Sequence, residues 1–381
     1  MSLENVFTLP GEYKDLQDSL RALSEKEIAP FAHAVDEDHR YPQEAHNALV
    51  RAGLFAAHVP TEFGGDGADA LATCIIIEEV ARVCGSSSLI PAVNKLGSLP
   101  LILSGTPEQK ERWLRPLAKG KGFSYCLSES EAGSDASALK TKAGRKGDNW
   151  VINGSKKWIS NAGESEFYTV IAQTDASLGS KGITAFVLEK SDPGISFGSP
   201  EKKMGFRGSP TREVYFDNVT VGDDRRISEI GKGFALAMDT LDHTRITIAA
   251  QALGIAQGAL DIAKRYAHER KQFGKEIFDF QGVQFMLADM AIAVETARQI
   301  TYAAAAKSER GDKDLKFFSA ASKTYASDVA MKVTTDAVQI LGGYGYVSDY
   351  PVERMMRDAK LTQIYEGTNQ IQRIVIARNL P

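Results

Sequence analysis

Cysteine is scarce in this sequence. Only three occur among 381 residues, Cys74, Cys84 and Cys126, and no two of them have C-x-x-C spacing. Three thiols in a chain of this length do not make a disulfide framework, and no spacing indicates a zinc or iron–sulfur site. We therefore expect a protein of a reducing compartment, the cytoplasm, that binds no metal.

An excess of one charge and a long apolar run are also lacking. The chain has 45 Lys and Arg against 49 Asp and Glu, a formal net charge of -4, whereas general nucleic-acid binding needs clustered basic side chains. No apolar run approaches the ~20 residues of a membrane helix. The N-terminal "MSLENVFTLPGEYKDLQ" lacks the basic start and apolar run of a secretory signal. We expect no nucleic-acid partner, no membrane and no secretion.

The composition that is present, 43% hydrophobic and 25% charged, is that of a globular protein, and the length favours two or three domains. Up to about residue 122 the apolar spacing is helical. Within this part we expect Pro30 to end or bend the first helix and Gly85 to close the helix in "ALATCIIIEEVARVCG". Thr106 is expected to cap a helix that begins at Pro107.

The pattern changes twice further along the chain. Short runs rich in β-branched and aromatic residues follow, and Asn153-Gly154 suits a tight hairpin turn. Long amphipathic helices then return, the last with Ile371, Ile374 and Ala377 on its apolar face. The predicted fold is multi-domain α+β: an N-terminal all-helical domain (1–122), a middle antiparallel β-barrel or sandwich domain (123–228) and a C-terminal four-helix bundle (229–381).

Four short motifs each allow a structural and a binding interpretation. "SESEAGSDAS" is a solvated turn or a loop that binds a polar ligand. Trp158 in "KKWISNAG" is a core residue or a surface for a flat ring. Gly342 and Gly343 in "QILGGYGY" cap a helix or bring amides to a phosphate, and the basic "HERKQFGKEI" caps a helix or grips phosphate. A Rossmann G-x-G-x-x-G and a hydrolase G-x-S-x-G are both missing.

One carboxylate stands in an unusual setting. In "LTQIYEGTNQIQ", Glu366 lies between an aromatic residue and a glycine, with aliphatic residues on both sides. Such an acid either favours the dipole of the helix that follows or is a general base whose proton affinity is raised by desolvation.

Together these motifs resemble the acyl-CoA dehydrogenase family of flavoproteins. The resemblance covers nearly the whole chain, in the family's order, through "FAAHVPTEFGGDG", "CLSESEAGSD", "NGSKKWISNAG", "MGFRGSPTREVYFDNV", "LDHTRITIAAQALGIAQGAL", "RKQFGKEIFDFQGVQFMLADM", "QILGGYGY" and "YPVERMMRDAKLTQIYEGTNQIQ". It implies one FAD per subunit and a fatty acyl-CoA substrate, oxidised to a trans-2-enoyl-CoA as in fatty acid β-oxidation. It also implies electron transfer to an electron-transferring flavoprotein and a homotetramer (dimer of dimers).

The resemblance assigns residues position by position. Glu366 is implied as the base that removes the α-proton while flavin N5 accepts the β-hydride, with the Glu366 amide and a ribityl hydroxyl bonded to the thioester oxygen. Substrate contacts fall on Ser134, Asp242, Arg245 and Gly367. FAD contacts fall on Tyr125, Leu127, Ser128, Trp158, Ser160, Arg270, Phe273, Gln281, Gln339, Gly342, Gly343, Thr368 and Gln370, and in this family some of them come from a neighbouring subunit.

Departures from the family pattern are few. Ser128-Glu129-Ser130 stands where Thr-Glu-Pro is frequent, and Ser160 where Thr is frequent, so both hydroxyls are kept. Family branches that place the base on another helix carry Glu at the position of Thr244, and the threonine here supports Glu366 as the base.

Three other functions compete with dehydrogenation. Acyl-CoA oxidases of this fold are usually longer, with an added C-terminal domain. A nucleic-acid-associated flavoprotein would need a strongly basic surface. A non-catalytic acyl-CoA or flavin binder would not need Glu366. The acyl chain length depends on how residues such as those in "LIPAVNKLGSLPLILSG" line the pocket, and we favour a short or branched chain.

Overall fold

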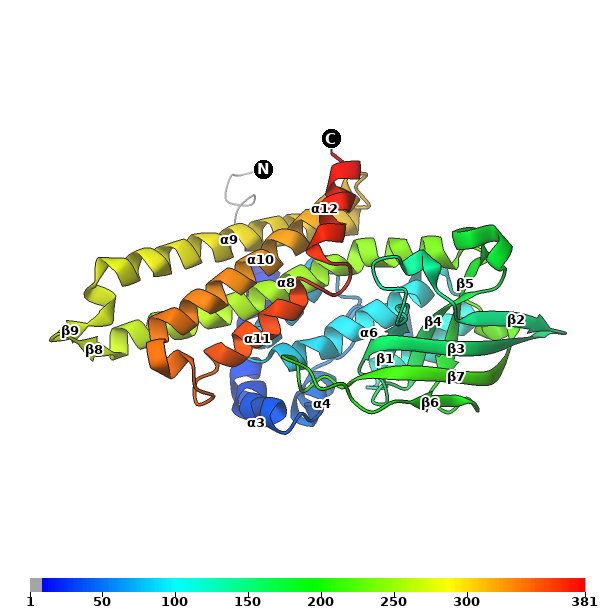
Figure 1. Ribbon diagram of the computed structural model, residues 1–381, viewed down its shortest axis with the longest axis horizontal. Coiled ribbons are helices and arrows are strands. Elements are labelled where there is room, and N and C mark those ends of the chain that lie inside the picture. Colours follow the sequence, from blue (N-terminus) through cyan, green and yellow to red (C-terminus); the bar gives the residue numbers. More distant parts are fainter. Residues whose placement is uncertain (1–8, 381) are drawn as a thin grey trace.

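Three successive blocks of secondary structure make up the chain, and the computed structural model describes residues 9–380 (Figure 1). The start of the segment on which the prediction of no secretory signal rests, residues 1–8, lies outside this range. The first block is helical and consists of α2 (Gly11–Leu23), α3 (Ala32–Glu37), α4 (Gln43–Arg51), α5 (Ala70–Ala81), α6 (Gly85–Ser104) and α7 (Pro107–Ala118). The predicted fold class is confirmed, while the exact domain boundaries remain predictions.

Two local predictions in the helical block are confirmed. Thr106 caps α7 with a full capping box: its hydroxyl accepts from the Gln109 N–H at 3.3 Å, and the Gln109 side chain accepts from the Thr106 N–H at 2.9 Å. Pro30 bends the chain, because a π-helical turn over Ser24–Ile28 and a 3-10 turn over Ala29–Phe31 precede the resumption of α-helix at Ala32.

The prediction for Gly85 was wrong. This glycine does not close α5, which ends at Ala81, but is the first residue of α6. Its role is close packing, because a Cβ at this position would lie 2.7 Å from a carboxylate oxygen of Asp358 and 3.1 Å from the Phe206 ring. Helix-ending preference was therefore overridden by a contact with a residue far along the chain.

The middle block is one seven-stranded sheet. Its strands are β1 (Phe123–Cys126), β2 (Lys142–Lys146), β3 (Asn149–Ser160), β4 (Phe167–Gln173), β5 (Ile183–Glu189), β6 (Ile195–Phe197) and β7 (Thr211–Gly222), in the order β1-β4-β2-β3-β7-β6 with β5 beside β4. The pairs β1–β4 and β2–β4 are parallel, which departs from the antiparallel arrangement expected, and the other pairs are antiparallel.

The hairpin predicted at Asn153-Gly154 was also wrong. Both residues lie inside β3, at a register shift of its ladder with β7, and the actual turn falls between Lys146 and Asn149. The Asn153 side chain accepts from the backbone N–H of Asn218 at 2.8 Å. Gly154, with φ +141, lies so close to Thr141 that a Cβ would be 2.7 Å from its Cα. This pair therefore serves a bulge and not a turn.

The last block is a bundle of α8 (Gly233–Glu269), α9 (Gln281–Arg310), α10 (Leu315–Leu341) and α11 (Val352–Thr362), followed by α12 (Asn369–Arg378). A small hairpin of β8 (Lys271–Gln272) and β9 (Lys275–Glu276) joins α8 to α9 at the end of the bundle opposite the sheet (Figure 1). α8 is long and apolar enough to cross a membrane, but 78% of its apolar window is buried inside the protein. Its apolar face therefore forms part of the core of the bundle.

The predicted apolar face of α12, by contrast, is partly exposed to solvent, with Ile374 45% exposed.

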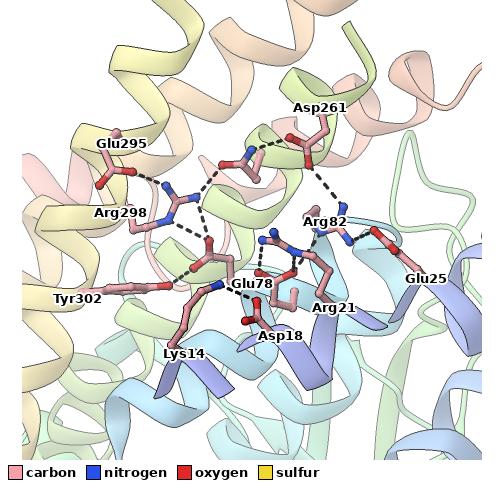
Figure 2. A network of polar contacts seen from close by, with 12 residues as sticks. Lys14, Asp18, Arg21, Glu25, Glu78, Arg82, Asp261, Glu295, Arg298 and Tyr302 are labelled. Atoms are coloured by element: carbon pink, nitrogen blue, oxygen red, sulfur yellow. Dashed lines mark hydrogen bonds and ion pairs between the residues drawn. The ribbon is translucent and has the colours of Figure 1, made fainter. Parts of the chain in front are cut away.

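A buried polar network ties the helical block to the bundle (Figure 2). Glu78 of α5, 1% exposed, accepts from Tyr302 at 2.7 Å and from Arg298 at 3.1 Å, both on α9. Arg82, the residue directly after α5, approaches Asp261 of α8 at 3.4 Å. Burial raises the pKa of Glu78, and Arg298 opposes this. Charges removed from water are costly unless they are paired, so these pairs fix α5 against α8 and α9.

Glycines allow α5 and α8 to approach each other closely. A Cβ at Gly254 would lie 2.2 Å from the Glu78 carbonyl oxygen, and one at Gly258 would lie 2.0 Å from the Arg82 carbonyl oxygen. The backbones are thus in direct contact over more than one turn, which holds α8 in place. The N-terminal half of this helix carries side chains of the site described next.

Candidate active site

Glu366 lies in the loop that joins α11 to α12, and its backbone is in the left-handed region. Its φ is 52°, and the φ of Gly367 is 91°. A left-handed conformation costs a residue with a side chain roughly 1–2 kcal/mol, so it persists only where the surroundings enforce it.

The Glu366 carboxylate is partly buried and has one hydrogen-bond donor among residues 9–380. The Thr244 hydroxyl of α8 donates to its Oε2 at 2.8 Å. Burial raises the pKa of Glu366 to about 7, while the Thr244 hydrogen bond and the charges of Arg245 and Lys323 act in the opposite direction. A carboxylate whose pKa lies near neutrality can both exist ionised and hold a proton, which is the property that a general base needs. Of the two interpretations of Glu366, the geometry favours the base.

Three side chains hold the backbone of this loop. Gln372 donates to the carbonyl oxygens of Glu366 and Gly367, each at 3.0 Å, and Lys323 donates to that of Gly367 at 2.8 Å. Arg245 approaches the Glu366 carbonyl oxygen at 3.5 Å. A Cβ on Gly367 would lie 2.7 Å from the Gln372 amide nitrogen. Glycine is therefore required here both by its φ and by the packing of Gln372.

The predicted substrate pair lies beside the same loop. Asp242 and Arg245 of α8 are 7% and 4% exposed and form an ion pair at 2.6 Å. Lys316 lies 4.0 Å from the second oxygen of Asp242. Burial raises the pKa of Asp242, against the attraction of Arg245. The structure thus brings Asp242, Arg245, Gly367 and Glu366 together, whereas the remaining predicted substrate residue, Ser134, is exposed in the loop after β1.

Tyr125 of β1 is another buried polar side chain. Its hydroxyl has no hydrogen-bond partner within residues 9–380. Burial and then the charge of Glu366 raise the pKa of Tyr125. A buried hydroxyl without a partner is costly in an apolar protein interior, so this one is available to a ligand.

A buried ion pair holds the loop that follows β1. The Lys156 ammonium, 0% exposed, donates to the Leu127 carbonyl oxygen at 3.0 Å and to Glu129 Oε1 at 2.7 Å. The Glu129 carboxylate also accepts from the backbone N–H groups of Lys140 and Thr141, at 2.6 and 3.0 Å. "SESEAGSDAS" is therefore not simply a solvated turn, because Glu129 fixes it to the buried Lys156. The predicted flavin contacts Leu127 and Ser128 are positioned by this anchor.

Trp158 is not a core residue. It is 56% exposed with φ 65°, and the Lys157 ammonium lies 4.8 Å from the centre of its ring. Two residues on, the Ser160 carbonyl oxygen accepts from the Ser124 hydroxyl of β1 at 2.7 Å, which joins the end of β3 to β1. A half-exposed indole beside a strand end offers a flat apolar surface to a ring system.

Two further predicted cofactor residues line a pocket. Thr368 caps α12, its hydroxyl accepting from the Ile371 N–H at 3.3 Å, and Gln370 is exposed in the first turn of that helix. The pocket has a volume of about 460 Å³, and its lining residues are Asp328, Lys360, Gln363, Ile364, Thr368, Asn369, Gln370 and Arg373. It opens beside the loop that carries Glu366.

Six predicted cofactor residues are not brought to Glu366. Arg270, Phe273, Gln281, Gln339, Gly342 and Gly343 lie around the β8–β9 hairpin and the end of α10, at the far end of the bundle (Figure 1). Phe273 is 93% exposed, and the Arg270 guanidinium stacks over Tyr344 at 5.5 Å. Gly342 follows α10 with φ +61, so it ends the helix as its structural interpretation predicted. Their assignment to the FAD of a neighbouring subunit remains a prediction.

The sequence did not predict a role for three residues of the site, Thr244, Lys323 and Gln372. Thr244 was noted only as the residue that is not glutamate, and Lys323 and Gln372 were not singled out. A lysine among the small and apolar residues of "FFSAASKTYASDVA" is a signal that such a cation is buried for a reason. No local signal marks Gln372.

Three family models match consecutive parts of the chain: the acyl-CoA dehydrogenase N-terminal domain at residues 10–121, the middle domain at 124–219 and the C-terminal domain at 231–380. The chain belongs to the acyl-CoA dehydrogenase family. Its members are FAD-dependent oxidoreductases. In this acyl-CoA dehydrogenase, side chains of α8 and α10 hold the loop that carries the partly buried Glu366.

Similar proteins agree in length as well as in sequence. The probable acyl-CoA dehydrogenase fadE25 of Mycobacterium leprae is 60% identical over 99% of this chain and 97% of its own. Butyryl-CoA dehydrogenase from Megasphaera elsdenii superposes with a TM-score of 0.95 at 43% identity, over 98% of this chain and 99% of that one. A chain in a structure described as the electron transferring flavoprotein of Acidaminococcus fermentans superposes with a TM-score of 0.96 at 45% identity, with the same coverage.

The residues present fit an FAD. The exposed Trp158 ring provides a flat apolar surface, the Tyr125 hydroxyl lacks a partner, and Thr368 and Gln370 line a pocket of about 460 Å³. A flat apolar ring and polar atoms with unused hydrogen-bonding capacity are the kinds of groups that bind a heterocycle with a polar edge.

Proposed function

We propose that this acyl-CoA dehydrogenase converts an acyl-CoA thioester to the trans-2-enoyl-CoA, with Glu366 as the base. The observation that carries the proposal is the Glu366 carboxylate, with a pKa raised to about 7 by burial, held on a left-handed turn beside Arg245 and the end of β1. The proton beside a thioester carbonyl is weakly acidic, so a base of raised pKa removes it more readily than a carboxylate in water does.

Other groups of the chain would orient the base, stabilise charge on the thioester oxygen and bind the substrate. Thr244 orients the carboxylate through its hydrogen bond. The backbone N–H of Glu366 makes no hydrogen bond within residues 9–380 and is free to stabilise charge that develops on the thioester oxygen. Ser134, Asp242, Arg245 and Gly367 contact the substrate. When bound, FAD would supply the two-electron oxidant for removal of the β-hydrogen.

We propose that Tyr125, Leu127, Ser128, Trp158, Ser160, Thr368 and Gln370 hold the FAD of their own subunit. A second set of residues would contact the FAD of a neighbour in a homotetramer (dimer of dimers), because within one chain they lie apart from Glu366 (Figure 1). These are Arg270, Phe273, Gln281, Gln339, Gly342 and Gly343.

The similarity to a chain from an electron-transferring-flavoprotein structure supports such a flavoprotein as electron acceptor. Three buried cysteines without disulfides support a cytoplasmic location.

A direct test is an anaerobic titration of the purified protein with butyryl-CoA. We expect the visible absorbance of bound flavin to decrease, with one acyl-CoA oxidised per FAD, and little oxygen uptake when air is admitted. Flavin that stays oxidised with acyl-CoAs of every chain length would refute dehydrogenation and leave a binding protein, and rapid oxygen uptake would identify an oxidase.

The wall beside the base favours a short acyl chain. Gln251 of α8, 0% exposed, donates to the Ser88 hydroxyl of α6 at 2.7 Å and accepts from the hydroxyl of Tyr365, the residue before the base. This bridge places a polar, hydrogen-bonded side chain across the space between α8 and α6, where an extended apolar tail would have to displace it. The similarity to butyryl-CoA dehydrogenase supports the same substrate class.

Replacing Gln251 with alanine is expected to change chain-length preference. Opening the bridge should raise kcat/KM for hexanoyl-CoA relative to butyryl-CoA by about tenfold or more, since even one of the two added methylenes contributes roughly 1–3 kcal/mol when an apolar pocket accommodates it. Gln257→Ala, on the same helix but directed at Asp261 and Arg298, is the control and should leave the ratio unchanged. An unaltered ratio in a folded, FAD-loaded Gln251→Ala protein would show that the bridge does not limit the pocket.

A further inference from the structure

Lys323 is a buried cation that contacts no counter-charge in the described part of the chain. It lies in the middle of α10 with 0% exposure. Its ammonium donates to the Gly367 carbonyl oxygen at 2.8 Å and to the Asn369 side-chain oxygen at 2.9 Å, and within residues 9–380 it forms no ion pair. Burying an ammonium is costly, and two neutral oxygens offset only part of that cost, so stability alone does not account for a lysine here.

Both partners of Lys323 flank the catalytic loop. Gly367 directly follows Glu366, and Asn369 begins α12. Asn369 is itself fixed, because its amide nitrogen donates to the Ser327 hydroxyl and to Asp328, each at 2.8 Å. Through these contacts α10 holds the left-handed turn, which α8 also holds through Thr244 and Arg245.

Charged and titratable groups act on Glu366 and Lys323 from the elements around them. Arg245 lies on α8 with its partner Asp242, Asp328 lies on α10, Tyr125 on β1, and Tyr365 in the loop itself. Burial lowers the pKa of Lys323 to about 7, and attraction to Glu366 raises it. The base and the lysine therefore stabilise each other's charged forms.

We propose that Lys323 is a positioning residue for the base: it fixes the Glu366–Gly367 turn through the Gly367 carbonyl, and its positive charge stabilises the ionised form of the Glu366 carboxylate. This inference rests on the proposed function, in which Glu366 acts as the base. Its distinctive consequence is a dependence on pH, because loss of an opposite charge nearby raises the pKa of a carboxyl by about one unit or more.

The test compares the pH dependence of kcat/KM for Lys323→Met with that of the wild type. Without the ammonium, the acid limb should move to higher pH by about one unit or more, so that activity falls several-fold near pH 7 and recovers largely near pH 9. Lys323→Arg should return the acid limb toward its wild-type position. Lys332→Met is the control, because Lys332 lies on the same helix, 62% exposed and paired with Asp336, and it should change nothing.

An equal loss of activity at every pH, or an acid limb at the wild-type position, would overturn the proposal for Lys323. If Lys323→Met does not fold, Lys323→Gln keeps an amide donor without the charge and should give the same shift. A second readout needs no turnover: the pH at which the infrared band of the protonated Glu366 carboxyl disappears, assigned with Glu366→Gln, should rise in the neutral variants. If wild type lacks dehydrogenase activity the proposed function fails, while this titration still decides the role of Lys323.

Discussion

Replacing Glu366 with glutamine is expected to lower kcat with butyryl-CoA by about 10²–10⁴-fold. Glutamine has nearly the same shape and can still bond to the Thr244 hydroxyl, but it cannot accept the α-proton. FAD should remain bound, because the residues proposed to hold it, such as Trp158 and Thr368, are unchanged. The measurement is steady-state turnover at saturating substrate, together with the visible spectrum of the variant.

The control for this change is Glu353→Gln, which alters a carboxylate on α11 that pairs with Arg357. It should retain wild-type turnover. The wild type should show the ionisation of the base itself: below pH about 7, where burial has placed the pKa of Glu366, kcat/KM should fall about tenfold for each further pH unit, because only the ionised carboxylate accepts a proton. Turnover of the Glu366→Gln variant near the wild-type rate would remove the base from the mechanism.

Replacing Glu129 with glutamine is expected to destabilise the protein by about 3–5 kcal/mol, because it leaves the Lys156 ammonium buried without a counter-charge. Lys156 is 0% exposed and Glu129 9%. The same change releases the loop after β1 that carries Leu127 and Ser128, so FAD occupancy should fall as well. Urea unfolding and the ratio of flavin to protein absorbance measure the two effects.

The matched control lies two residues away. Glu131→Gln breaks an ion pair with Lys140 on the surface, where both side chains are about three-quarters exposed, and should leave stability and FAD content unchanged.

The pH dependence of the stability of Glu129→Gln provides a second test. Burial lowers the pKa of Lys156, so in the Glu129→Gln variant the buried ammonium loses its proton as the pH rises, and the stability deficit should shrink toward alkaline pH. A deficit independent of pH would indicate lost hydrogen bonds and not an unpaired charge.

Local patterns in the sequence predicted most of the architecture. The three blocks follow from hydrophobic periodicity, and Thr106 followed by Pro107 gave the start of α7, because capping depends only on residues within one turn. The predictions that failed also used local rules. Gly85 and Asn153-Gly154 have the composition of a helix end and of a hairpin turn, but contacts with Asp358 and with Thr141 and Asn218 determine their conformations.

For the functional site, too, some features could be predicted from local sequence and others could not. The order of motifs along the chain identified the acyl-CoA dehydrogenase family and pointed to Glu366, because those short segments keep their residues wherever the fold places them. The sequence also predicted that desolvation would raise the proton affinity of this carboxylate, but it did not predict the contacts that Lys323 and Gln372 make with its loop. Gly367 was assigned to the substrate, whereas in the folded chain its conformation is also required by Gln372.

The sequence alone was thus sufficient for the family, the order of helices and strands, and the identity of the proposed base. Only the folded chain shows what surrounds that base: the Thr244 hydroxyl from 122 positions away and the Lys323 ammonium that bonds to the neighbouring Gly367 from 44 positions away. The reason is physical, since the proton affinity of a carboxylate depends on the water it has lost and on charges within a few ångströms. Neither is defined until distant segments pack together.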